Sequence, residues 1–141
     1  AVAERFGAPV RAPEFTEIGK RSLESIALEN AVEGCVRETF GALVATWQSQ
    51  AARDEGIARA LRDIAEDETR HAEFSWELQR WVDGVLDEGA RARVHAARAQ
   101  ATASLWAELD APVDPSLVAV AGMPDRDTAR ALFSAMTFAL A

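Results

Sequence analysis

The most informative part of the sequence is residues 57–82, which read IARALRDIAEDETRHAEFSWELQRWV. At about 100° per residue, one helix face collects five apolar side chains: Ile57, Leu61, Ile64, Ala65 and Ala72. Glu68 lies in the middle of this face, and His71 follows one turn later. We therefore expect a carboxylate and an imidazole to point into the core. Because a buried carboxylate without a partner is costly, Glu68 requires either a positively charged side chain or a bound cation.

Composition limits the class of protein. At 141 residues the chain is long enough for one domain and too short for two. Few Val or Ile runs alternate with polar residues, so we expect an all-α fold. The net charge of -8 argues against a nucleic-acid surface, which needs clustered positive charge. Cys35 is the only cysteine, which excludes an intramolecular disulfide, and its apolar neighbours indicate a buried, inert thiol.

Neither a membrane span nor a targeting segment is visible in the sequence. No apolar run reaches the ~18 to 20 residues that a membrane-spanning helix needs. The first residues, Ala-Val-Ala-Glu, begin as though inside a helix. We therefore expect the sequence to be a piece of a longer protein, and the sequence does not assign a cellular location.

Three segments are expected along the chain. Residues 1–15 are the end of a preceding helix plus a linker, because Gly7, Pro9 and Pro13 interrupt the helical pattern. Residues 16–86 form an antiparallel helical hairpin with a turn at 53–56. Residues 87–141 form a C-terminal helical extension, in which Pro112 and Pro115 end one helix.

The hairpin has recognisable helix starts. Its first helix begins with Thr16 or Ser22 as the N-cap and continues to about residue 51. Asp54 is the expected N-cap of the second helix. Because a short turn joins two long amphipathic helices, they should lie side by side in opposite directions. Gly34 and Gly41 in the first helix indicate close packing against a neighbouring helix.

The Glu-x-x-His sequence at 68–71 could carry chemistry. On a helix it places Glu68 and His71 one turn apart on the same face, where both could bind one ion. The alternative is a buried salt bridge from Glu68 to Arg37 or Arg70, without a metal.

The first helix offers further carboxylates for a cation. Counted from Arg53, Glu68 and His71 lie fifteen and eighteen residues along the second helix, and Glu33 lies twenty residues back along the first. Glu33 also falls within the apolar arc of the first helix, so it is the expected third ligand. Glu38, fifteen residues back, fits the height but points nearly opposite, which makes it the reserve ligand or an outer-shell group.

These residues carry a resemblance to a known superfamily. Residues 29–43 (ENAVEGCVRETFGAL) and 64–78 (IAEDETRHAEFSWEL) resemble one hairpin of the ferritin-like superfamily, which includes rubrerythrins, bacterioferritins and di-iron oxygenases. With residues 6–13 (FGAPVRAP) before them, they are similar to the C-terminal half of uncharacterised bacterial ferritin-like proteins. The resemblance covers about residues 1–82.

The resemblance implies a four-helix bundle with two irons, in which each hairpin supplies one lone Glu and one Glu-x-x-His. Glu33 matches the lone carboxylate, with Glu68 and His71 as the pair. The interval from Glu33 to Glu68 is 35 residues, toward the long end for the superfamily, which leaves Glu38 open as the ligand. Because this chain contains one such set, we expect half a site, completed by a homodimer or by an upstream hairpin of the parent chain.

The function implied by this resemblance is oxidation of ferrous iron, or reduction of O2 or peroxide, at a di-iron or di-manganese centre. The chain would then be a ferroxidase-like or peroxidase-like oxidoreductase. One alternative is a helical scaffold or oligomerisation module that binds no metal. Another is a di-iron oxygenase acting on a small organic substrate, which an apolar cavity beside Glu33 would support.

Overall fold

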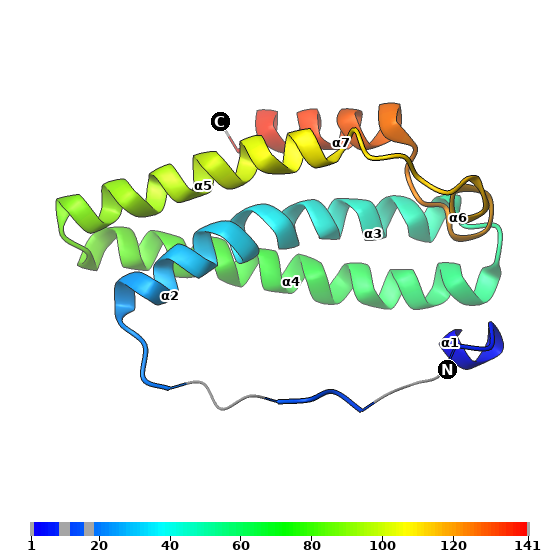
Figure 1. The fold of residues 1–141 in the computed structure, drawn as a ribbon, viewed down its shortest axis with the longest axis horizontal. Coiled ribbons are helices and arrows are strands. Elements are labelled where there is room, and N and C mark those ends of the chain that lie inside the picture. Colours follow the sequence, from blue (N-terminus) through cyan, green and yellow to red (C-terminus); the bar gives the residue numbers. More distant parts are fainter. Residues whose placement is uncertain (1, 9–11, 16–18, 141) are drawn as a thin grey trace.

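A computed structural model describes residues 2–8, 12–15 and 19–140 of the chain. The helices in chain order are α1 (Val2–Arg5), α2 (Leu23–Glu29), η1 (Asn30–Glu38), α3 (Thr39–Ala51), α4 (Glu55–Val85), α5 (Glu88–Glu108), α6 (Pro115–Ala121) and α7 (Arg126–Ala139). The described residues contain no strand, so the all-α prediction is confirmed (Figure 1).

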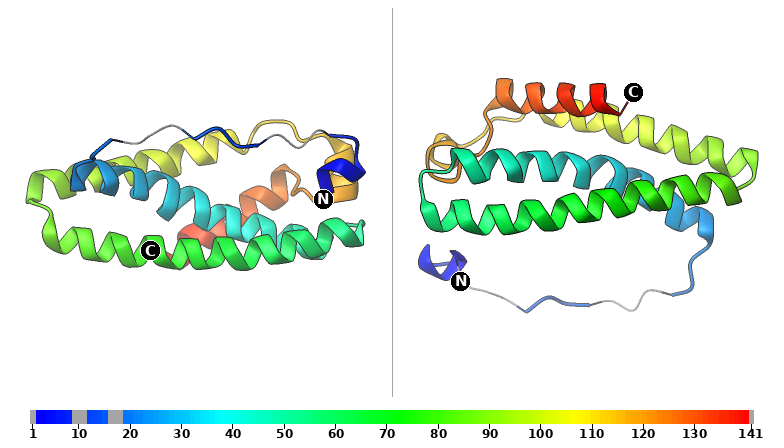
Figure 2. Two further views of the ribbon diagram at one scale, coloured as in Figure 1. Left: turned by 90° about the horizontal axis from the view of Figure 1, so that it is seen from below. Right: turned by 180° about the vertical axis from the view of Figure 1, so that it is seen from behind.

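The central element is an antiparallel hairpin. Helices α2, η1 and α3 follow one another without a break and run beside α4 in the opposite direction (Figures 1 and 2). Ser22 caps the first arm, because its Oγ accepts the backbone N–H of Ser25 at 3.1 Å. Asp54 caps α4 by accepting the backbone N–H groups of Gly56 and Ile57 at 2.9 Å each. Both predicted caps are confirmed; Thr16, the other candidate start, lies outside the described residues.

The middle of the first arm is a π-helix, which the sequence did not predict. In the nine residues of η1, backbone hydrogen bonds run from i to i+5, so each turn holds more residues than an α-turn. Gly34 of η1 lies directly against Ser75 of α4. The close packing expected at Gly34 is therefore present. At Gly41, by contrast, an added Cβ would meet nothing within 4 Å, so that position is open.

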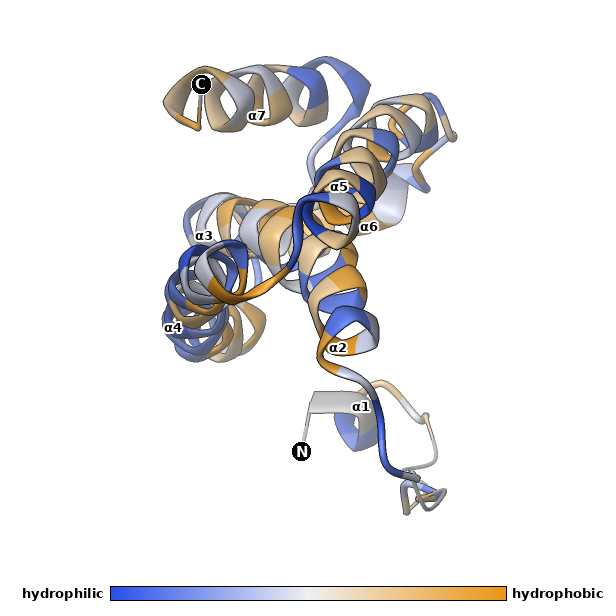
Figure 3. Ribbon diagram, turned by 90° about the vertical axis from the view of Figure 1, so that its left-hand side faces the viewer, coloured by the Kyte–Doolittle hydropathy of each residue, from blue (hydrophilic) through white to orange (hydrophobic). Residues whose placement is uncertain are grey.

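The C-terminal extension supplies much of the core. One cluster of buried side chains joins η1 and α3 to α5 and α7 and consists of Val36, Phe40, Ala101, Leu105, Phe133 and Met136. The Phe133 ring lies between Phe40 and Trp106, with centroids 6.1 and 5.3 Å away. A second cluster joins α2, η1, α4 and α5 and consists of Ala27, Ala31, Val82 and Val94. Seen along the helices, α3 and α4 lie side by side, with α7 at the opposite side of the molecule from α1 (Figure 3).

One flank of α4 leaves apolar side chains exposed, although the sequence pattern placed Ile64 in the core. Ile64, Phe74, Trp81 and Val85 are all exposed. Ile64 and Val85 lie seven residues before and fourteen after His71, so these residues share a flank of the helix with it. In the described part of the chain, no helix combines the length and the apolar character that crossing a membrane would require.

Candidate metal centre

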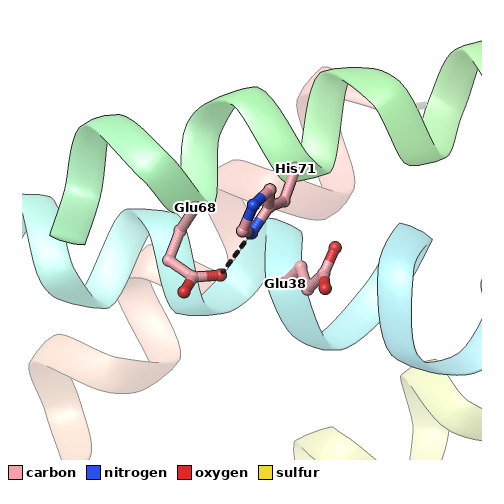
Figure 4. A group of neighbouring side chains, drawn as sticks. All are labelled: Glu38, Glu68 and His71. Atoms are coloured by element: carbon pink, nitrogen blue, oxygen red, sulfur yellow. Dashed lines mark ion pairs between the residues drawn. The ribbon is translucent and has the colours of Figure 1, made fainter.

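The structure brings three of the four candidate ligands together. Glu38 is the last residue of η1, and Glu68 and His71 lie one turn apart on α4. Their carboxylate oxygens and ring nitrogen all lie within 4.8 Å of one another. Figure 4 shows the three side chains in the space between the two arms of the hairpin.

Glu33, the expected third ligand, lies elsewhere, and Glu38, the reserve, takes its place in the group. The Glu33 side chain is 60% exposed, and its Oε1 lies 3.9 Å from Nε of Arg37 on the same helix. The face assignment failed because it assumed 100° per residue through η1. The wider π-turns change the direction of each later residue, and Glu38 stands at the end of that segment. The height assignment, which favoured Glu38, agrees with the structure.

The group is less buried than the sequence indicated. The Glu68 side chain is 33% exposed, in keeping with its place beside the first arm, whereas the His71 side chain is 61% exposed. The expectation that the imidazole points into the core is therefore wrong. His71 belongs to the exposed flank of α4, while α5 and α7 pack against η1 and α3.

Neither arginine proposed for a salt bridge pairs with Glu68. Arg37 donates two hydrogen bonds to Glu108 of α5, at 3.0 and 2.8 Å, and holds the pKa of that carboxyl below its usual range. Arg70 pairs with Asp67 on its own helix. Oε2 of Glu68 lies instead 3.9 Å from Nδ1 of His71, which is too long for a hydrogen bond. Two carboxylates thus lie close together without an arginine between them.

Ser75 holds one carboxylate of the group, that of Glu38, and the sequence analysis did not identify it. Its hydroxyl donates to Oε2 of Glu38 at 3.2 Å, and its backbone carbonyl accepts a hydrogen bond from the Asn30 amide at 3.0 Å. Ser75 is buried, so few other conformations are open to it. The available signal was a small polar residue one turn after His71 on the inner face of α4.

The chain was also compared with known proteins. No protein-family model matches it, and no curated protein and no solved structure is significantly similar to it. The geometry therefore carries the functional argument. An apolar cavity beside Glu33 would have supported the di-iron oxygenase alternative, but Glu33 does not line any of the main cavities of the described residues.

Proposed function

We propose that this chain holds one half of a ferritin-like metal centre, with Glu38, Glu68 and His71 as ligands for iron or manganese. One observation carries the proposal. Two carboxylates and an imidazole from two helices converge, and within the described residues no lysine or arginine is paired with either carboxylate. A bound cation would relieve the repulsion between these carboxylates.

The donor set fits the proposed metals. Two oxygen ligands and one nitrogen ligand suit iron or manganese better than a closed zinc site built from cysteine and histidine. Two ligands at ~2.2 Å from one ion can be at most ~4.4 Å apart, so the observed grouping within 4.8 Å needs only small side-chain rotations. The exposed His71 ring is free to make such a rotation.

Three protein ligands are a partial site, which agrees with the resemblance to one hairpin of a di-metal bundle. The exposed flank of α4 carries both His71 and the apolar Ile64, Phe74, Trp81 and Val85. A second hairpin placed there would cover the apolar side chains and supply the missing ligands. This second hairpin would come from a second copy of this chain or from an upstream hairpin of the parent chain.

The chemistry assigned to the site is oxidation and reduction. Iron bound there would supply electrons to O2 or peroxide by cycling between its ferrous and ferric states. The protein's own contribution is electrostatic and geometric: Glu38 and Glu68 neutralise positive charge, and the Ser75 hydroxyl fixes the direction of one Glu38 oxygen. The exposed edge at His71 gives a small oxidant access to the site. We therefore favour ferroxidase-like or peroxidase-like activity.

Metal binding by matched variants tests the proposal. Purified protein is loaded with ferrous iron without oxygen, or with Mn2+, and metal per chain is measured together with the mass of the same column fractions. Glu38→Gln and Glu68→Gln should each weaken binding at least tenfold. Glu66→Gln, an exposed neighbour outside the group, should bind like the wild type. Glu33→Gln decides between the two carboxylates of the first arm. If Glu33→Gln weakened metal binding and Glu38→Gln did not, the assignment of Glu38 as a ligand would be contradicted.

Stability provides an independent test against the metal-free scaffold. Saturation with a ligand at about 100 times its Kd raises the free energy of unfolding by about 2.7 kcal/mol, so excess EDTA should lower the melting temperature of the loaded protein. The metal-free scaffold would be favoured by two results together. The melting temperature would be the same with metal and with EDTA, and neither the monomer nor the dimer would bind metal at any concentration tested.

A further inference from the structure

Two cavities lie on the flank of α4 that faces away from His71. Helix α7 packs against α3 and leaves a cavity of about 540 Å³ between α3, α4 and α7, lined by Leu43, Ala72, Trp76, Met136 and Leu140 among others. This volume is within the range of ~300 to 1,000 Å³ typical of small-molecule sites. A neighbouring cavity of about 340 Å³ reaches α5 and shares Trp76, Met136 and Leu140 with the first. The two cavities therefore adjoin along the C-terminal half of α7.

The uncharged polar groups in the larger cavity are already engaged in hydrogen bonds, and the charged residues of its lining are Glu73, Glu77 and Arg80. The hydroxyls of Thr46 and Thr69 each donate to a backbone carbonyl of their own helix at 2.7 Å. The indole N–H of Trp76 donates to Oγ1 of Thr39 at 3.0 Å. Because these hydrogens are engaged, the lining is more apolar than its residue types indicate. An apolar body is the ligand that such a lining accepts.

One cation borders the shared wall. The guanidinium of Arg98 lies 5.3 Å from the ring centroid of Trp76 and lines the smaller cavity. Within the described part of the chain, Arg98 forms no ion pair, although the protein is strongly acidic. His95, on the same wall, is paired with Asp83 at 3.0 Å. The charge of Arg98 is therefore available to an anion inside the cavity.

We infer that these adjoining cavities bind an amphipathic carboxylic acid, with its apolar chain along Trp76, Met136 and Leu140 and its carboxylate at Arg98. The apolar lining selects the chain, and the unpaired guanidinium selects the acidic end. The site lies away from His71 and does not depend on the metal proposal, so either can fail without the other.

Binding of decanoate to the metal-free chain tests the inference. Decanoate, below the concentration at which it forms micelles, is titrated by calorimetry, with tryptophan fluorescence as a second readout because Trp76 lines both cavities. Decanol and decylamine are the head-group controls. We expect one decanoate per chain and at least tenfold weaker binding of decylamine. Equal affinity for all three would refute the assigned head-group contact.

Matched variants locate the site. Arg98→Met should weaken decanoate binding at least tenfold and leave decanol binding unchanged, whereas Arg59→Met, at an exposed arginine of α4, should change neither. Ala135→Phe fills the larger cavity and should abolish binding of both probes, whereas Ala131→Phe, on an exposed part of α7 outside the cavity lining, should not. Circular dichroism confirms that each variant is folded. Wild-type binding by folded Arg98→Met or Ala135→Phe would overturn the inference.

Discussion

Replacing Gly34 by alanine tests the contact between η1 and α4. An added Cβ at this position would overlap Oγ of Ser75 and lie 2.7 Å from its Cβ and 2.9 Å from Oδ1 of Asn30. Real Cβ atoms do not approach other atoms so closely, and both neighbours are fixed by hydrogen bonds. The helices would have to separate, or Ser75 would have to rotate away from Glu38.

The expected cost follows from three contributions. Overpacking of this kind costs about 1 to 3 kcal/mol. Loss of the Ser75 to Glu38 hydrogen bond adds about 1 kcal/mol in this half-buried setting. Alanine regains about 1 kcal/mol, because it is a better helix former than glycine. Gly34→Ala should therefore lower the free energy of unfolding by about 2 kcal/mol.

Gly41 provides the matched control for this substitution. An added Cβ there meets nothing within 4 Å, so Gly41→Ala should gain up to about 1 kcal/mol from helix propensity alone. Urea unfolding followed by circular dichroism at 222 nm measures both variants against the wild type. If Gly34→Ala were as stable as the wild type, or if the two variants shifted in the same direction by similar amounts, the close contact with α4 would be refuted.

Three further predictions concern other parts of the fold. Gly122 has a φ of 62°, and an added Cβ would lie 2.5 Å from the backbone nitrogen of Ala52, just after α3. Gly122→Ala should therefore lower the free energy of unfolding by about 3 kcal/mol, and an unchanged melting temperature would contradict this. Burial raises the pKa of the Cys35 thiol to about 11 from 9.0. The thiol of the unfolded chain loses its proton at a lower pH, so the free energy of unfolding should fall as the pH rises above about 9. Between pH 8 and pH 10.5, urea unfolding should show a fall up to about 2 kcal/mol larger in the wild type than in Cys35→Ala. Thr39→Val leaves the Trp76 indole N–H without its acceptor and should cost about 1 kcal/mol in urea unfolding, whereas Thr46→Val, whose hydroxyl bonds only within its helix, should cost less.

The helical hairpin could be predicted because its determinants are local. Ser22 and Asp54 mark helix starts through their own side chains, and the structure has both as N-caps. The last helix follows the same rule, because Asp125 accepts the backbone N–H of Thr128 at 2.9 Å. Contacts between distant segments gave no such signal. The packing of Phe133 between Phe40 and Trp106 depends on how α7 returns to α3, which periodicity alone does not determine.

The site was predicted only in part, for a definite reason. Glu68 and His71 lie on a regular α-helix, so their spacing could be converted directly into a shared face. Glu38 is the last residue of the nine-residue π-helix, and the residue types do not show where hydrogen bonding changes from i+4 to i+5. An angular projection through η1 therefore assigns Glu33 and Glu38 to the wrong faces. A count of residues from the turn is less sensitive to this change, because each arm still advances along the same axis.

The π-helix and the candidate site depend on the same residue of α4. The backbone carbonyl of Ser75 accepts hydrogen bonds from the Asn30 amide at 3.0 Å and from the Cys35 thiol at 3.6 Å, and its hydroxyl donates to Glu38. Gly34 permits this approach because it has no Cβ. A π-helix is rare and usually limited to a single turn, so the nine-residue η1 indicates that tertiary contacts stabilise it. Here those contacts come from Ser75, whose hydroxyl also holds one oxygen of Glu38, so the unusual helix and the orientation of the proposed ligand depend on the same residue of α4.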